Sequence, residues 1–237
     1  MESIVGHLVI DRVLGLLFPR FCLRCGREGT AWCAGCAASF APLPPVARCP
    51  FCERTGSWRS CADCRENTYL DGLVAVAPYG NAIVREALTA WKYHSDPEMG
   101  RVVDLWIRQA AATRDAFSFP SGATVTHLPL HASRRRHRGF DQAEEVARSF
   151  AAAYGGSLRT LLVRTSATAP QALRAAGDRM VGDLDGTFAA AGEVPRKVIL
   201  CDDVCTSGAT MDAAAKALKD VGAEVVWGFA VARGSHP

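Results

Sequence analysis

The chain has 237 residues, of which 49% are hydrophobic and 22% charged, and its formal net charge is +3. This composition supplies enough apolar residues to fill a core and excludes a disordered or fibrous protein. The small positive charge argues against a strongly basic DNA-coating protein, and the length predicts one large domain with a small one, or two modest domains.

Residues 1–20 predict a short amphipathic helix packed on the body of the protein. Apolar residues recur there at helical spacing, namely Ile4, Leu8, Val9, Val13, Leu16 and Leu17. A helix lying on a membrane surface is less favoured, because the segment lacks the Lys- and Arg-rich polar face that such helices use. The segment has no signal-peptide pattern, and no run approaches the roughly 20 apolar residues of a membrane span. We therefore expect a cytoplasmic protein without a membrane span.

Eight of the ten cysteines lie between residues 22 and 64, as four C-x2-C pairs. Two such turns bring four thiolates to one ion in the tetrahedral geometry that zinc adopts. Disulfides need an oxidising compartment, and redox C-x2-C motifs normally occur singly, so both alternatives are disfavoured. We predict a double zinc ribbon over residues 21–68 with two zinc ions, whose ligands are Cys22, Cys25, Cys33, Cys36, Cys49, Cys52, Cys61 and Cys64.

The pairing of these cysteine turns stays open between two arrangements. Sequential pairing joins the first turn to the second and the third to the fourth, whereas a cross-brace joins the first to the third. The short linkers within each sequential site favour the sequential arrangement. In either case cysteine fills all four positions and leaves none for a substrate water, so the zinc is expected to be structural. The metal would replace a hydrophobic core that about fifty residues cannot build.

From residue 69 onward the sequence alternates between apolar runs and helical patterns. Strands that are apolar on both faces, separated by helices, indicate a parallel sheet covered by helices. The predicted fold class is therefore α/β, with an open, mostly parallel sheet and flanking helices over residues 69–237. Strands are expected at residues 73–78, 123–130, 158–163, 197–202 and 223–231, and helices at residues 81–93, 98–117, 141–154 and 209–221, with Asp141 placed to cap the third helix.

The segment VILCDDVCTSGAT, residues 198–210, predicts the functional site. Apolar residues end a buried strand, two adjacent carboxylates follow, and small or hydroxylated residues open a helix. Ligands of open α/β sheets bind at the carboxyl ends of strands, where a helix N-terminus holds phosphate. Asp202 and Asp203 suit neighbouring hydroxyl groups, or a divalent cation reached through water. The plain alternative is that these two residues only end a strand and cap a helix. The predicted ligand is a ribose 5-phosphate, whose phosphate would contact Thr206, Ser207, Gly208, Ala209 and Thr210.

This thirteen-residue pattern resembles the phosphoribosyl pyrophosphate (PRPP) signature of type I phosphoribosyltransferases. The stretch THLPLHASRRRHRGFDQA from Thr126, the run FPRFCLRCG from Phe18 and the run YGNAIVREALTAWKY from Tyr79 are similar to ComF-family proteins. The resemblance spans nearly the whole chain. It implies a double zinc ribbon joined to a type I phosphoribosyltransferase domain that uses magnesium with PRPP. Relatives in this family are associated with DNA uptake during natural transformation.

The resemblance also implies roles for particular residues. Asp202 and Asp203 would bind the ribose hydroxyls, and the turn from Thr206 to Thr210 would bind the 5-phosphate. The pyrophosphate loop would include Leu130, His131, Arg134 and Arg138, and the lid over the reacting bond would include Gln171 and Arg179. Guanidinium groups match pyrophosphate oxygens bidentately. Lys92, in the AWKY run, either reaches the site as in similar proteins or is a surface lysine.

Two departures from the family pattern weaken parts of this assignment. The family usually has Asn where this chain has Asp141, and the lid segment departs from the usual pattern of Gln, Leu and Asn. Some transferases also carry a carboxylate inside the phosphate loop as a base for a purine. Here that position is Thr206, which argues mildly against purine salvage.

Three functions remain open from the sequence. The first is a transferase that moves phosphoribosyl from PRPP to an unidentified nitrogen acceptor. The second is a catalytically silent PRPP- or nucleotide-binding module that supports a DNA-processing protein. The third is a single-stranded-DNA-binding accessory protein that uses the ribbons and the arginine cluster. The ribbon aromatics Trp32, Phe40, Phe51 and Trp58 could serve as stacking platforms, although packing of a small metal-held core is the favoured interpretation.

Overall fold

The structure is a computed structural model, and it describes most of the chain. The predicted N-terminal helix, the predicted lid and most of the predicted pyrophosphate loop fall outside the described part. The described residues are 19–40, 47–94, 96–112, 117, 119–130, 140–165 and 186–234.

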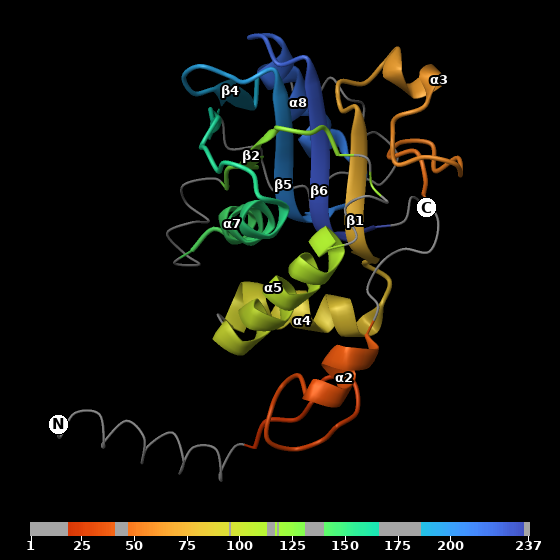
Figure 1. The fold of residues 1–237 in the computed structure, drawn as a ribbon, viewed down its shortest axis with the longest axis vertical. Coiled ribbons are helices and arrows are strands. Elements are labelled where there is room, and N and C mark those ends of the chain that lie inside the picture. Colours follow the sequence, from red (N-terminus) through yellow and green to blue (C-terminus); the bar gives the residue numbers. More distant parts are fainter. Residues whose placement is uncertain are drawn as a thin grey trace, which may run out of the picture.

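A four-stranded parallel sheet forms the centre of the molecule, which confirms the predicted α/β class (Figure 1). Its strand order is β1-β6-β5-β2, and every neighbouring pair is parallel. The strands are β1 (Gly72–Pro78), β6 (Val225–Arg233), β5 (Lys197–Cys205) and β2 (Thr124–His127). Seven consecutive residues of β6 are buried, as expected for a strand whose two faces are both covered.

Helices cover both faces of this sheet. On β5, Ile199 and Cys201 pack with the apolar cluster that includes α4, α5 and α7, whereas Val198 and Leu200 pack with the cluster that includes α8. Figure 1 shows α8 behind the sheet and α5 and α7 in front of it. These helices span α4 (Ala82–His94), α5 (Pro97–Ala112), α7 (Gln142–Tyr154) and α8 (Ala209–Lys219).

Several predicted strand boundaries differ from the structure. The strand expected at residues 123–130 is the shorter β2, Thr124–His127, and the strand expected at residues 223–231 is β6, Val225–Arg233. The predicted strand 158–163 is divided, since Leu158 forms only an isolated parallel bridge with Val125, and the chain then enters β3 (Leu162–Arg164). β3 pairs antiparallel with β4 (Phe188–Ala190), a three-residue strand that the sequence pattern does not predict. β5 also continues to Cys205, beyond its predicted end at residue 202, because it stays paired with β6 as far as Arg233.

Each cysteine region contributes one short helix, and the two lie at opposite ends of the molecule in Figure 1. These helices are α2 (Ala34–Ser39) and α3 (Ala62–Arg65). Cys33 and Cys61 occupy the positions just before them. Among the helices that the structure describes, none is long and apolar enough to cross a lipid bilayer.

Candidate functional site

The acidic pair lies inside β5 near its carboxyl end, where it meets a cation from α4. Lys92 Nζ lies 2.7 Å from Asp203 Oδ2, and both side chains are largely buried. The backbone N–H of Asp203 donates to Asp202 Oδ1 at 2.8 Å. Burial and the adjacent Asp203 carboxylate raise the pKa of Asp202 well above its ordinary value. Burial disfavours the charged form of Asp202, and the neighbouring carboxylate repels a second negative charge. The pair is therefore suited to hydroxyl donors or a cation.

The turn after β5 leads directly into α8. Gly208 immediately precedes α8 with φ of 81°, a left-handed conformation that glycine adopts without strain, and no side chain caps the helix from that position. Ser207 Oγ accepts a hydrogen bond from the backbone N–H of Ala209 at 3.4 Å. Thr206 is exposed. The first turn of α8 therefore combines backbone donors, hydroxyl groups and the positive end of the helix dipole, the features that hold phosphate elsewhere.

Asp141 connects the end of the β2 segment to the start of α7. Its Oδ1 accepts hydrogen bonds from the backbone N–H groups of Ala143 at 3.1 Å and Glu144 at 3.4 Å, so it caps α7 as predicted. Its Oδ2 accepts the backbone N–H of Leu130 at 3.1 Å. Of the residues predicted for the pyrophosphate loop and lid, Leu130 is the one that the structure describes. The others, His131, Arg134, Arg138, Gln171 and Arg179, lie outside the described residues.

The two buried thiols that flank the acidic pair are packing residues. Cys201 is fully buried, and Cys205 is nearly so. Burial, reinforced by the negative charge of Asp202, raises the pKa of Cys205 to about 12. Both side chains belong to the apolar clusters on the two faces of the sheet. A buried free cysteine packs as a small apolar residue.

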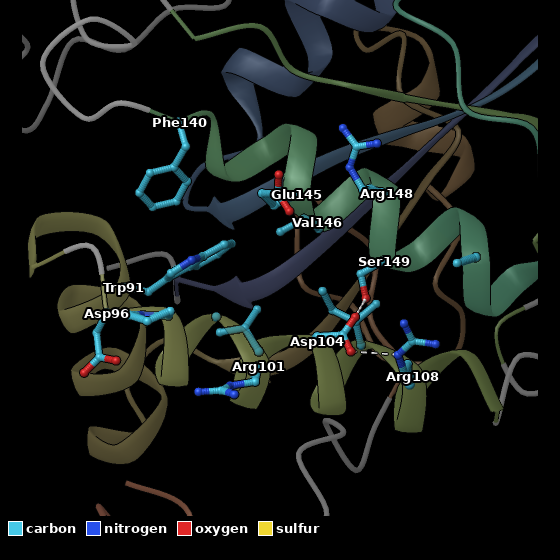
Figure 2. Close-up of a pocket in the computed structure, with 15 residues that line it drawn as sticks. Trp91, Asp96, Arg101, Asp104, Arg108, Phe140, Glu145, Val146, Arg148 and Ser149 are labelled. Carbon is cyan, nitrogen blue, oxygen red and sulfur yellow. Dashed lines mark hydrogen bonds and ion pairs between the residues drawn. The ribbon is translucent and has the colours of Figure 1, made fainter. Parts of the chain in front are cut away.

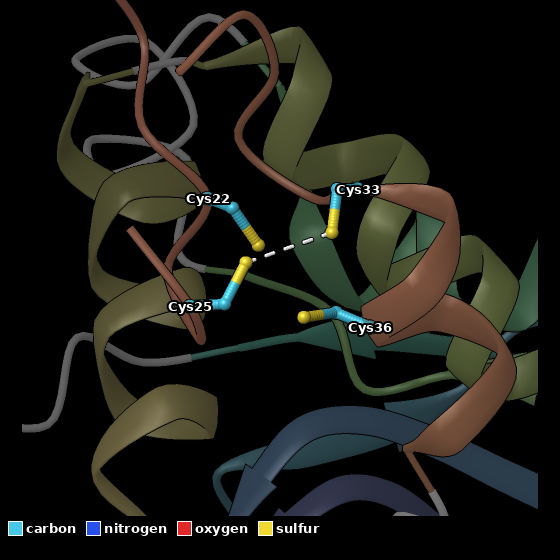
Figure 3. Close-up of side chains that lie close together, drawn as sticks. All are labelled: Cys22, Cys25, Cys33 and Cys36. Atoms are coloured by element: carbon cyan, nitrogen blue, oxygen red, sulfur yellow. Dashed lines mark hydrogen bonds between the residues drawn. The ribbon is translucent and has the colours of Figure 1, made fainter. Parts of the chain in front are cut away.

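The cysteines gather in two groups of four, and the grouping is sequential. In each group the four sulfur atoms lie within 4.8 Å of one another. Figure 3 shows the four sulfurs of the first group pointing toward a common centre. The two groups are Cys22, Cys25, Cys33 and Cys36, and Cys49, Cys52, Cys61 and Cys64. Four soft thiol ligands at this separation are suited to bind zinc.

Backbone amides lower the pKa of Cys22 and Cys33 in the first group and of Cys49 in the second, which favours the thiolate form. Burial raises the pKa of Cys22, but backbone N–H groups near its sulfur outweigh that effect and lower the pKa to about 6. Burial also raises the pKa of Cys49, but backbone N–H groups near its sulfur outweigh burial and lower the pKa to about 6. One of the donors is the backbone N–H of Cys61, 3.4 Å from the Cys49 sulfur. Metal ligation requires the thiolate, so each group provides a preformed ligand.

A groove of about 560 Å³ lies between α5 and α7, and none of the predicted site residues lines it. Figure 2 shows the rings of Trp91 and Phe140 at one end and Asp104, Arg108 and Ser149 at the other. The two ring centroids are 6.0 Å apart, and Asp104 Oδ2 pairs with Arg108 Nε at 2.7 Å. Sequence reasoning missed this groove because its residues follow the same helical spacing as ordinary core positions.

Comparison with known proteins gives a family match in the carboxyl-terminal part of the chain. A family model described as a phosphoribosyl transferase domain matches residues 138–235. This range contains the acidic pair, the turn after β5 and the whole of α8.

Two curated relatives extend over most of the chain. The sequence is 23% identical over 210 residues to "Competence protein ComFC" of Streptococcus pneumoniae, covering 87% of this chain and 89% of that protein. It is 26% identical over 214 residues to "Competence protein F" of Haemophilus influenzae, covering 84% of this chain and 89% of that protein.

Among solved structures, the chain is similar to one described as "Structure of the allosteric regulatory enzyme of purine biosynthesis". The TM-score is 0.39 and the sequence identity 22%, over 60% of this chain. The matched part spans 29% of that protein's length.

Proposed function

We propose that this protein binds PRPP with magnesium at the carboxyl end of β5. The proposal is supported by the match to a phosphoribosyl transferase domain and by the similarity to the ComF competence proteins along most of the chain. We further propose that it transfers the phosphoribosyl group to a nitrogen acceptor. In this proposal, residues 69–237 form the transferase domain, and residues 21–68 form a structural domain that holds two zinc ions.

The single observation that carries this proposal is the position of the acidic pair within the matched domain. Asp202 and Asp203 lie near the end of β5, and the turn that follows enters α8 at Gly208, a residue with no side chain to cap the helix, while Ser207 Oγ accepts the amide of Ala209 alone. A ribose 5-phosphate has vicinal hydroxyl groups and a dianionic phosphate. The carboxylates would accept the hydroxyl protons, and the turn from Thr206 to Thr210 would bind the phosphate.

Magnesium fits the same carboxylates. Lys92 is the cation that pairs with Asp203 among the described residues, and burial first, then repulsion from Asp203, raises the pKa of Asp202. A divalent ion held through water by this pair would relieve the repulsion. When bound, magnesium would neutralise charge on the departing pyrophosphate.

The residues of this chain would act by positioning the reactants and by neutralising charge. Pyrophosphate leaves with the electron pair of its bond to the anomeric carbon, a carbon–nitrogen bond forms, and the acceptor nitrogen gives its proton to solvent water. Lys92, a residue on α4 next to the acidic pair, would keep Asp203 in place before PRPP arrives. Fixed groups at the developing charges lower the barrier without reorganising during the reaction.

The aromatic residues of the cysteine regions favour packing over DNA stacking. The rings of Trp32 and Phe40 contact each other and Trp106 of α5, and Trp58 contacts Phe117. Base stacking needs exposed ring faces. The alternative that remains is a PRPP-binding module without catalysis, which supports a DNA-processing protein.

Thermal unfolding with PRPP and magnesium tests the binding proposal. A ligand at about 100 times its dissociation constant adds about 2.7 kcal/mol to the unfolding free energy, so the midpoint should rise. Asp202→Asn combined with Asp203→Asn should abolish the rise. Asp220→Asn, at the far end of α8, is the matched control and should keep it. A wild-type protein with no rise at millimolar PRPP would contradict the proposal.

A pyrophosphate-release assay then separates an enzyme from a silent binder. Labelled PRPP is incubated with a panel of amines and ammonia. Release that depends on both the amine and Asp202 and Asp203 supports transfer. Binding without release for any amine supports the silent module.

A further inference from the structure

The second cysteine region, residues 47–68 and called the second module below, contacts the proposed phosphate turn directly. Its loop between Cys49 and Cys52 carries Phe51, whose ring lies against Gly208. A methyl group added at Gly208 would stand 3.4 Å from Phe51 Cε1. Phe51 also packs on the apolar cluster that contains Cys205 and Met211, the residues on either side of the turn. The ring therefore forms an outer wall of the turn that leads into α8.

A buried guanidinium ties the same loop to the end of β6. Arg233 Nη2 donates to the backbone carbonyl of Pro50 at 2.6 Å and lies 3.7 Å from Glu53 Oε1. The Arg233 side chain is 14% exposed. In the sheet, Arg233 is paired with Cys205, the last residue of β5. A charged donor with little access to water is costly to leave without a hydrogen-bond acceptor. Moving the Pro50 carbonyl away from Arg233 would carry this cost, so the contact restrains the loop strongly.

A buried carboxylate ties the other end of the second module to the first turn of α8. Asp212 is fully buried. Its Oδ1 accepts the backbone N–H groups of Tyr69 at 2.7 Å and Leu70 at 2.8 Å, just after the module ends. Ser60 Oγ donates to the carbonyl of Leu70 from inside the module. The turn and the first helical turn are thus held from two sides by one small region.

We propose that a metal ion at Cys49, Cys52, Cys61 and Cys64 is what gives the phosphate turn its binding shape, and that the other cysteine group has no such effect. This inference rests on the proposed function for the identity of the ligand. The residues between Cys49 and Cys52 have no core of their own, so the metal bonds fix where Phe51 and the Pro50 carbonyl lie. Without the metal, Phe51 leaves Gly208 and Arg233 loses its acceptor. The turn then samples other conformations.

Two matched cysteine variants test this coupling. Cys52→Ser removes an exposed ligand from the second group, and Cys25→Ser removes an exposed ligand from the first. Zinc content should fall from two to one per chain in each. Hydrogen–deuterium exchange of the peptide covering residues 205–213 should accelerate only in Cys52→Ser. The dissociation constant for ribose 5-phosphate should rise about tenfold in Cys52→Ser, a typical coupling between sites, and stay within about twofold in Cys25→Ser.

A second pair of variants keeps all cysteines in place. Phe51→Ala removes the wall of the turn, and Phe40→Ala removes the aromatic ring that packs beside the first group. Both proteins should retain two zinc ions. Only Phe51→Ala should accelerate exchange at residues 205–213 and weaken ribose 5-phosphate binding.

The outcomes separate the coupling from the proposed function. Equal exchange at residues 205–213 in Cys52→Ser and Cys25→Ser, or a wild-type protein that holds no zinc, would overturn the coupling. Faster exchange confined to Cys52→Ser and Phe51→Ala supports it. If these two variants show the faster exchange but the wild-type protein does not bind ribose 5-phosphate, the coupling is supported and the proposed ligand is contradicted.

Discussion

The two cysteine groups have the same ligands and similar spacing, but they are attached to different parts of the molecule. The first packs on α5, where Trp32 meets Trp106 with ring centroids 5.5 Å apart and Glu98 accepts from Thr30 Oγ and the Ala31 amide. The second lies against the turn before α8, through Phe51 and Arg233. The structural role of a cysteine group therefore cannot be inferred from its ligands alone, because it depends on which elements the surrounding loop contacts.

Trp106→Ala should give the largest effect and should act on the first group alone. Trp106 is fully buried, and removing such an indole costs about 3–5 kcal/mol. Chemical denaturation should show this loss. If the two regions are energetically separate, the affinity for ribose 5-phosphate should be unchanged under conditions where the variant is folded. A large loss of affinity in folded Trp106→Ala would break the comparison.

Asp212→Ala should have the next largest effect and should act at the second module. The change leaves the buried amides of Tyr69 and Leu70 without their acceptor, at a cost of about 2–4 kcal/mol for two unpaired buried donors. Asp212→Asn keeps one oxygen acceptor and should lose less. Exchange measurements should show opening at residues 60–70 and 205–213, and opening confined to residues 19–40 would contradict this assignment.

Glu98→Gln should give a smaller effect with a defined pH dependence. Burial opposes it, but hydrogen bonds from Thr30, the Ala31 amide and Arg20 outweigh burial and lower the pKa of Glu98 below its ordinary value of 4.5. A lowered pKa in the folded state stabilises the protein above the unfolded pKa, and this stability is lost as pH falls through the folded pKa. The variant should cost about 1–2 kcal/mol at neutral pH and progressively less below about pH 5.

Asp63→Asn is the matched control in the second module and should have the smallest effect. Asp63 pairs with Arg54 at 2.8 Å, but the two side chains are 69% and 63% exposed. Exposed ion pairs contribute about 0–1 kcal/mol. Thermal unfolding at low and high salt should differ little between this variant and wild type. A loss as large as that of Glu98→Gln would show that exposure does not explain the difference.

Local patterns were sufficient to predict much of the fold. Long apolar runs predicted β5 and β6, and the position of Asp141 predicted the cap of α7, because each signal lies within a few residues of the element. β4 was missed because Phe188–Ala190 has three residues and pairs only through β3. The extension of β5 to Cys205 was missed because pairing with β6 outweighs the low strand propensity of two aspartates.

The candidate site likewise contains residues that one segment of the sequence predicts and residues that only the folded structure brings together. Asp202, Asp203 and Gly208 follow one another in the chain, so one segment sufficed to predict them. Lys92 stayed open between a site residue and a surface residue, because its partner lies on another element. The contacts of Phe51, Arg233 and Asp212 join segments more than 140 residues apart. Only the folded sheet brings such segments together, and no spacing in the sequence indicates them.

The two oxygens of Asp141 have separate partners, and this determines what its replacement would do. One oxygen caps α7 and the other accepts the Leu130 amide. Asparagine, the residue that the family resemblance implies at this position, has a single oxygen, and its NH2 group would face one of these N–H donors. In this protein asparagine would therefore place two hydrogen-bond donors head to head. Asp141→Asn would therefore loosen the contact that joins Leu130 to the start of α7.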